Sequence, residues 1–272
     1  MKVSVLAFLP LLLPLAWSLP TAGTEKLGPR KNTIFSERHR LAKRSNTDLN
    51  ELLSLIVNLF PVNIIVENVS GLITASEKVL AAIAGIDTTE NDLTSGNCGD
   101  VTIIFSRGTT ETGNVGVLVG PSFFEAVTDI LGGDASLAVQ GVEYDADIPG
   151  FLEGGDTEGS QKMADLVTQA FTQCPSSKIV MSGYSQGGQL VHNAAALLPA
   201  STMAEVSSVV VFGDPNDGEV VTNADGGKTL VICHDGDNIC DHGDLILLPH
   251  LTYAKNADEA ASFVVASAGS LG

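Results

Sequence analysis

The stretch Lys178-Ile-Val-Met-Ser-Gly-Tyr-Ser-Gln-Gly-Gly-Gln189 decides the fold. It begins as a short apolar run typical of a strand, passes through Gly-x-Ser-x-Gly, and continues into an Ala- and Leu-rich helical run that ends at Leu198. This order predicts a nucleophile elbow, a sharp strand-to-helix turn in which Ser185 stands exposed above a helix N-terminus. Gly183 and Gly187 give the turned backbone room. An ordinary strand-to-helix turn is the alternative, and the strand and helix on either side argue against it.

Apolar runs that read as strands alternate with amphipathic helical runs on both sides of this turn. The expected strands are 101–105, 135–142, 178–182, 206–212 and 229–233, and the expected helices are 122–131, 159–173, 186–198 and 257–266. Ser122 is the expected cap of the first of these helices, and Gly132 its end. The alternation predicts a three-layer α/β-hydrolase, in which helices cover both faces of a central, mostly parallel sheet.

The N-terminal 44 residues differ from the rest in composition. Residues 1–18 have a lysine, an apolar run and a small-x-small ending, as in a signal peptide, and the run is too short for a membrane anchor. Residues 19–44 are basic and end in Lys43-Arg44, so we interpret them as a pro-segment, with a retained basic tail as the alternative. The sequence therefore predicts a secreted protein without a transmembrane anchor.

Two further regions follow the expected pro-segment. Residues 45–94 read as a helical extension, although 62–66 also fits a strand, and this extension either packs on the main domain or covers the active site as a lid. It contains the glycosylation sequon at Asn68. Residues 95–272 form the expected catalytic domain.

The composition of the chain limits the classes of partner that it can bind. The chain of 272 residues is 44% apolar and 17% charged, which suits one sizeable core. Its formal net charge of −18 argues against a nucleic acid or an anionic membrane as the binding partner. Nothing in the sequence suggests more than a monomer.

A serine nucleophile needs a histidine base, and the base needs a carboxylate that holds its tautomer. On this fold the acid and then the histidine follow the serine in the chain, which leaves several candidates. They are His234, His242 and His250 for the base, and Asp235, Asp237, Asp241 and Asp244 for the acid. His192 lies on the helix after the serine and is interpreted as a surface or packing residue, and His39 falls in the pro-segment.

The four cysteines are expected to form disulfides, because a secreted protein folds in an oxidising compartment. Three pairings are possible. Cys233 and Cys240 are close enough to pin a tight loop that holds a carboxylate, and by exclusion Cys98 would then pair with Cys174. A metal site at the short loop is the alternative, but the spacing fits no common zinc pattern. We expect no metal and no cofactor.

The oxyanion of an acyl-transfer reaction also needs hydrogen-bond donors. One is the backbone N–H of Gln186, directly after the serine, and the second comes from a loop after an early strand. The loop 106–116 follows the first expected strand and is dense in glycine and hydroxyl residues, which suits close backbone approach. A polar surface loop without this function is the alternative.

Four motifs, in order and with similar spacing from about Cys98 to about Val265, resemble those of the fungal cutinase family. They are Arg107-Gly-Thr-Thr-Glu-Thr-Gly-Asn114, Gly183-Tyr-Ser-Gln-Gly187, Cys233-His-Asp-Gly-Asp-Asn-Ile-Cys240 and Pro249-His-Leu-x-Tyr253. The resemblance implies a compact α/β-hydrolase without a lid, with an exposed serine, and with the disulfide pairing given above.

The resemblance also implies which residues form the site. The acid lies four residues after the first cysteine of the short loop, at Asp237, and the base opens the His-Leu-x-Tyr motif, at His250. Thr109 stands where the family usually has the oxyanion-loop serine, and it keeps both the backbone N–H and a hydroxyl. Ile246 and Leu251 stand where the family has aliphatic residues of the substrate wall.

The resulting hypothesis is a secreted serine esterase that cleaves plant cutin or similar aliphatic polyesters, and small esters, through an acyl-enzyme. Alternatives on the same fold are an acetylxylan esterase and a lipase. A secreted binding or immune-eliciting protein without catalytic activity is an alternative from another class.

Overall fold

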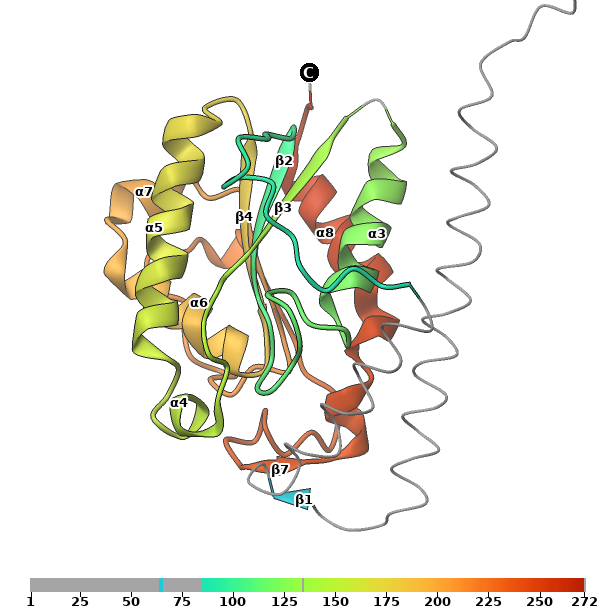
Figure 1. The fold of residues 1–272 in the computed structure, drawn as a ribbon, viewed down its shortest axis with the longest axis vertical. Coiled ribbons are helices and arrows are strands. Elements are labelled where there is room, and N and C mark those ends of the chain that lie inside the picture. The colour runs from blue at the N-terminus through green and yellow to red at the C-terminus, as the bar shows by residue number, and fades with distance from the viewer. Residues whose placement is uncertain (1–63, 66–84, 134, 272) are drawn as a thin grey trace, which may run out of the picture.

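A sheet of five parallel strands lies between two layers of helices in the computed structural model (Figure 1). The structure describes residues 64–65, 85–133 and 135–271. The strand order is β3-β2-β4-β5-β6, so the connection from β3 to β4 passes over β2 and leaves β2 beside the strand that leads to Ser185. The strands are β2 (Val101–Ser106), β3 (Leu137–Gly141), β4 (Lys178–Tyr184), β5 (Ser208–Phe212) and β6 (Thr229–Ile232). The expected architecture and all five expected strands are confirmed.

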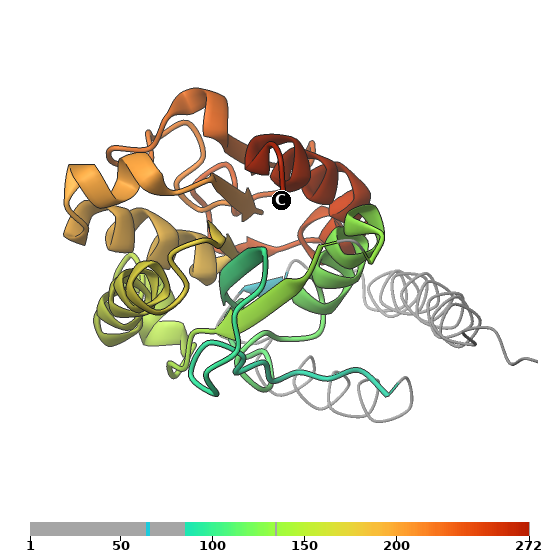
Figure 2. The ribbon, with the colours of Figure 1, turned by 90° about the horizontal axis from the view of Figure 1, so that it is seen from above.

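Each face of the sheet is covered by one pair of long helices (Figure 2). On one face α3 (Gly120–Leu131) packs beside α8 (Ala257–Ala268), and on the other α5 (Thr157–Gln173) packs beside α6 (Gln186–Leu197). The shorter helices are α4 (Ile148–Leu152), α7 (Ala200–Glu205), η1 (Gly226–Lys228), η2 (Leu248–Leu251) and η3 (Tyr253–Asn256). Among the described residues, no helix combines the length and the apolar character needed to cross a membrane.

Strand β2 shows why the sheet needs both helical layers. All six of its residues are buried, as the continuous apolar run predicts for a parallel strand with a covered face on each side. Ile103 and Phe105 point into the core under α3 and α8, whereas Ile104 belongs to the core under α5 and α6. The apolar run therefore fills two cores at once and fixes the centre of the molecule.

Helix α3 begins earlier than the sequence predicted. Ser122 is not its cap, because the helix begins at Gly120 and Val119 precedes it without a side-chain capping bond. Pro121 lies in the first turn, where its fixed φ suits a helix and its missing N–H leaves no donor unsatisfied. The expected end is confirmed, since Gly132 adopts a left-handed φ of 68°.

The N-terminal extension is described only in part. The helices expected within 47–84 lie outside the described residues, as do the signal peptide, the pro-segment and Asn68, so these stay predictions. Strand β1 (Ile64–Ile65) pairs antiparallel with β7 (Leu245–Ile246) at the sheet end where α4 also lies (Figure 1). Residues 88–93 pack on the main domain. The carbonyl of Thr88 accepts hydrogen bonds from the amides of Asn114 and Val115, and Leu93 is fully buried.

Both expected disulfides are present. Cys98 and Cys174 close a loop of 76 residues and join the chain just before β2 to the end of α5. Cys233 and Cys240 close a loop of only seven residues directly after β6. Since both sulfurs of the short loop are bonded to each other, they are not free to act as metal ligands there.

The two disulfides should differ in what they contribute. Loop-closure entropy predicts that replacing Cys98 and Cys174 by alanine lowers the free energy of unfolding by about 4.5 kcal/mol, against about 2.3 kcal/mol for Cys233 and Cys240. Urea denaturation of the two double variants beside the unaltered protein measures both values. Equal losses, or a larger loss from the short loop, would contradict the entropic explanation.

Candidate active site

Ser185 occupies the sharp turn that joins β4 to α6. Its backbone has φ 56° and ψ −123°, a region that non-glycine residues rarely adopt, and its N–H donates to the C=O of Phe212 on β5. A Cβ at Gly183 would collide with the Gly187 carbonyl, and a Cβ at Gly187 would collide with the carbonyl of Ser106. Both glycines are therefore required by backbone contacts, as the Gly-x-Ser-x-Gly pattern predicted.

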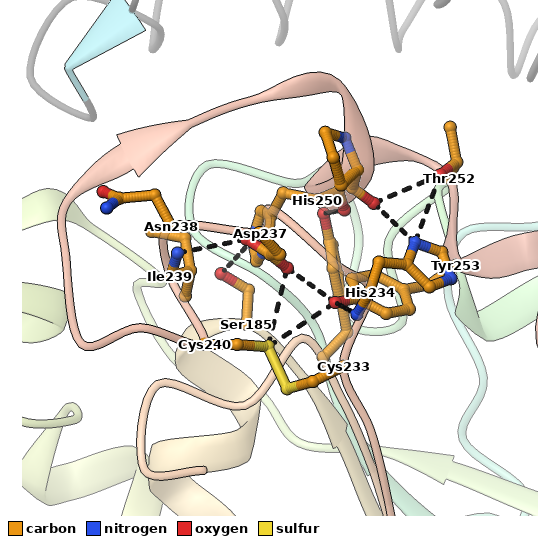
Figure 3. Close-up of polar contacts among 12 residues, drawn as sticks. Ser185, Cys233, His234, Asp237, Asn238, Ile239, Cys240, His250, Thr252 and Tyr253 are labelled. Carbon is orange, nitrogen blue, oxygen red and sulfur yellow. Dashed lines mark hydrogen bonds and ion pairs between the residues drawn. A yellow bond between two sulfur atoms is a disulfide. The ribbon is translucent and has the colours of Figure 1, made fainter.

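Three side chains from distant parts of the chain meet at this turn (Figure 3). His250, on η2, places Nε2 2.9 Å from the Oγ of Ser185, and its Nδ1 lies 2.8 Å from Oδ2 of Asp237. Asp237 comes from the loop closed by the short disulfide. An imidazole that donates Nδ1–H to the carboxylate leaves Nε2 as an acceptor for the serine hydroxyl, so the geometry selects one tautomer. The other candidate acids and bases stay outside this chain of contacts.

The site is buried, in contrast to the exposed serine that the resemblance implied. Ser185 is 3% exposed, and Asp237 and His250 are each 1% exposed. Ile239 of the disulfide loop, whose N–H donates to Asp237, packs with Phe151 of α4, and Ile246 of β7 joins this small apolar cluster. In the described conformation the serine therefore does not lie open to solvent.

The carboxylate of Asp237 accepts three hydrogen bonds. Its Oδ2 accepts from His250 and from the Tyr253 hydroxyl at 2.6 Å, and its Oδ1 accepts from the Ile239 N–H at 3.0 Å. Burial acts to raise the pKa of this carboxyl, but the contacts from His250, Tyr253 and Ile239 outweigh it, and the pKa lies below its ordinary value. Asp237 is therefore held in its charged form beside the imidazole.

Tyr253 joins the acid loop to the rest of the site. Its ring is fully buried and its hydroxyl, besides donating to Asp237, accepts the N–H of His234 at 3.0 Å. Burial, followed by the hydrogen bond to the carboxylate, raises the pKa of this phenol, so it stays a donor. In the sequence Tyr253 stands out only as the end of a motif, and its contact with Asp237 could not be predicted because the fold brings the hydroxyl and the carboxylate together.

The other histidines that the structure describes make structural contacts. The ring of His234 stacks on Tyr253 with centroids 4.1 Å apart, and its nitrogens contact the Pro249 carbonyl at 2.8 Å and the Asn256 side chain at 2.7 Å. His192 is buried on α6, with Nε2 2.9 Å from Asp214. It is a packing residue, one of the two roles expected. His242 contacts the carbonyl of Pro215.

The two candidate oxyanion donors come from different elements. Gln186 is the first residue of α6, where helix geometry leaves the N–H without an intrahelical acceptor. Thr109 lies in the loop after β2; within the described residues its N–H has no acceptor, and its buried Oγ has no partner either. The amides before and after it, of Gly108 and Thr110, are both hydrogen-bonded.

The two expected substrate-wall residues differ in position. Ile246 is half-buried and packs against the Phe151 cluster, whereas Leu251 is 5% exposed and belongs to the core under α3 and α8. Contact of either residue with a substrate stays a prediction. Within the described ranges, no group of three or more His, Cys, Asp or Glu side chains is arranged to hold a metal ion.

Residues 97–268 match the family model described as Cutinase. A cutinase of Pyrenopeziza brassicae is 55% identical over 72% of this chain and 95% of that protein. A cutinase of Botryotinia fuckeliana is 57% identical over 63% of this chain and 85% of that protein. A solved structure of Trichoderma reesei cutinase in complex with a C11Y4 phosphonate inhibitor is 48% identical and superposes with a TM-score of 0.70, covering 82% of this chain and 99% of its own.

Replacing Tyr253 by phenylalanine should lower stability in a pH-dependent way. Loss of a hydrogen bond to a charged carboxylate lowers the free energy of unfolding by about 2 kcal/mol at pH 7. Because the folded-state pKa of Asp237 is depressed, this contribution is complete above the unfolded-state pKa and disappears as pH falls below about 4. Urea denaturation between pH 3 and 7 measures the difference.

Tyr144→Phe is the matched control for this experiment. The Tyr144 hydroxyl is also buried, but it donates to the backbone carbonyl of Arg107, which does not titrate. Its loss should therefore lower stability by a similar amount at every pH. A stability difference for Tyr253→Phe that does not change between pH 3 and 7 would contradict the proposed hydrogen bond to a charged Asp237.

Proposed function

Since this chain belongs to the cutinase family and is a carboxylic ester hydrolase, we propose that Ser185, His250 and Asp237 are its nucleophile, general base and orienting acid. The observation that carries the proposal is the continuous chain of hydrogen bonds, 2.9 Å from serine to histidine and 2.8 Å from histidine to carboxylate. Both distances are short enough for direct hydrogen bonds, which proton transfer between these groups requires.

The reaction begins when the Oγ of Ser185 attacks the carbonyl carbon of the ester. As the new carbon–oxygen bond forms, the serine proton passes to Nε2 of His250, and the charged Asp237 stabilises the resulting imidazolium. The tetrahedral intermediate then collapses, the bond to the leaving alcohol breaks, and His250 returns the proton to that alcohol. Water attacks the acyl-enzyme with the same histidine as base and releases the acid.

The negative charge on the intermediate needs donors, and we assign this role to the amides of Thr109 and Gln186. An N–H without an acceptor in the resting protein is available to a developing oxyanion at no cost in broken hydrogen bonds. The unpartnered Thr109 hydroxyl supplies a third donor. Loss of one such donor typically raises the barrier by about 3 kcal/mol.

The proposed substrate is plant cutin or a similar aliphatic polyester, together with small soluble esters. The names of the relatives support a polyester substrate, and the apolar cluster of Phe151, Ile239 and Ile246, which adjoins Asp237 through Ile239, supports an aliphatic acyl group. We also propose that the enzyme acts outside the cell, because two disulfides are maintained in an oxidising compartment and residues 1–18 have the pattern of a signal peptide. It needs no metal or cofactor for this reaction.

Ser185→Ala should reduce the hydrolysis of p-nitrophenyl butyrate by about 10⁶-fold and leave the fold intact, since only the attacking oxygen is lost. The measurement is the initial rate, with circular dichroism as the check on folding and labelling by a fluorophosphonate probe as the second readout. Ser207→Ala, a buried serine at the opposite end of the sheet, is the matched control and should keep both activity and labelling. Retained hydrolysis in Ser185→Ala would refute the assignment, and a parent protein that the probe does not label would favour the non-catalytic binding protein.

The length of the acyl chain distinguishes the polyester hydrolase from an acetylxylan esterase. An aliphatic wall predicts that kcat/KM for p-nitrophenyl esters rises from acetate to butyrate or hexanoate, because each added CH₂ that is buried contributes about 0.8 kcal/mol. A series of p-nitrophenyl esters from two to twelve carbons measures this profile. A sharp maximum at acetate would instead support the acetylxylan esterase.

A further inference from the structure

We propose that Glu111 is a positioning residue for the oxyanion site, and that its buried carboxylate holds the peptide of Thr109 in place. The inference rests on the proposed function, in which the Thr109 amide is one of the two backbone donors. In the sequence Glu111 is a member of the motif 107–114, and the proposed mechanism gives its side chain no role.

The carboxylate of Glu111 joins two parts of the loop between β2 and α3. Its Oε2 accepts the N–H of Gly108 at 2.7 Å, one residue before Thr109. Its Oε1 accepts the N–H groups of Val117 and Leu118, both at 2.9 Å, just before α3 begins. The residue next to the oxyanion donor is thereby tied to a segment that is itself packed in the core.

The peptide after Thr109 is fixed as well. The N–H of Thr110 donates to the Ala146 carbonyl at 2.7 Å, and Thr110 has a positive φ of 66°. The Thr109 amide thus lies between two anchored neighbours while its own N–H keeps no acceptor within the described residues. Preorganised donors stabilise an oxyanion because they need no rearrangement during the reaction. The hydrogen bond from Gly108 to Glu111 therefore contributes to catalysis by holding the Thr109 amide in place.

Arg107 closes the same loop from behind. Its Nε donates to the backbone carbonyl of Glu111 at 2.8 Å and its Nη2 to the carbonyl of Tyr144 at 2.7 Å. The Tyr144 hydroxyl donates back to the Arg107 carbonyl. The guanidinium therefore joins the backbone of Glu111 to that of Tyr144, in the segment after β3, and provides a positive charge near the buried carboxylate.

A buried carboxylate is energetically costly unless its oxygens accept hydrogen bonds. Glu111 is 5% exposed, and burial raises the pKa of its carboxyl, although the three amides and Arg107 act to lower it. Only a carboxylate offers two acceptor oxygens and no donor, which three N–H groups in this geometry require. The carboxylate also fills the space that a Cβ at residue 116 would occupy, which explains why Gly116 is a glycine.

The test is Glu111→Gln, which keeps the size of the side chain but replaces one acceptor oxygen by an NH₂ group that faces an N–H donor. We expect kcat for p-nitrophenyl butyrate to fall by about 10²-fold, while KM changes little, because a misplaced donor affects the transition state. A second readout is the rate ratio between this ester and its thionoester, in which sulfur replaces the carbonyl oxygen.

The thionoester ratio separates positioning from general destabilisation. Sulfur is a weak acceptor, so an intact oxyanion site favours the oxygen ester strongly, and a displaced site favours it much less. Glu111→Gln should therefore reduce the ratio by about 10-fold or more. The matched control is Asp92→Asn. In the unaltered protein the Asp92 carboxylate also accepts a backbone N–H, from Val139 at 2.9 Å, but it lies outside the oxyanion loop. This control should lose stability and keep the ratio.

A folded Glu111→Gln with unchanged kcat and unchanged ratio would overturn the proposal. Should that variant fail to fold, Glu111→Asp decides in the same way, because it keeps the charge but is too short to hold Gly108 and the 117–118 amides together. Failure of both variants to fold would overturn positioning in favour of a purely structural role. Failure of the proposed function would give a different result. Ser185→Ala would keep its activity, or the parent protein would not hydrolyse the oxygen ester faster than the thionoester.

Discussion

Two backbone carbonyls lie where the Cβ atoms of residues 183 and 187 would otherwise be, and this close contact between the serine turn and the end of β2 constrains the rest of the site. It brings the end of β2 and Arg107 directly against Gly187 in the first turn of α6. The Ser106 hydroxyl strengthens the same contact by donating to the Gly187 carbonyl at 2.8 Å. Ligand sites of open α/β sheets form at the carboxyl ends of the strands for this reason: loops from neighbouring parallel strands emerge there together.

Two buried carboxylates then hold these loops, and their environments differ. Asp237 faces His250, Tyr253 and one amide, and the net effect lowers its pKa. Glu111 has only backbone amides on its oxygens, so the effect of burial prevails and its pKa is raised. In the proposed mechanism the first carboxylate stabilises a charge that forms on the imidazole. The second keeps an amide ready for a charge that forms on the substrate.

Local patterns predicted the secondary structure well because the local and tertiary preferences agree. The apolar run of β2 is buried on both faces, and the end of α3 at Gly132 has the left-handed conformation that glycine favours. The start of α3 was predicted wrongly, because a serine suggested a cap while Pro121 in the first turn allowed the helix to begin earlier. The contacts of Asp237 with Tyr253, and of Glu111 with three amides, could not be predicted, since they depend on the exact placement of turns rather than on periodicity.

By itself, the sequence determined the alternation of strands and helices, the serine turn and the short cysteine loop, because each depends on neighbours within a few residues. Chain order alone left three histidines and four aspartates open, and the resemblance, not the physics of the pattern, selected one of each. Only the tertiary structure decided which side chains meet, that Ser185 is buried, that Tyr253 donates to Asp237 and that Glu111 accepts the N–H of Gly108. Hydrogen bonds between residues far apart in the chain form only when the packed sheet sets their distance and direction, and no local pattern contains that information.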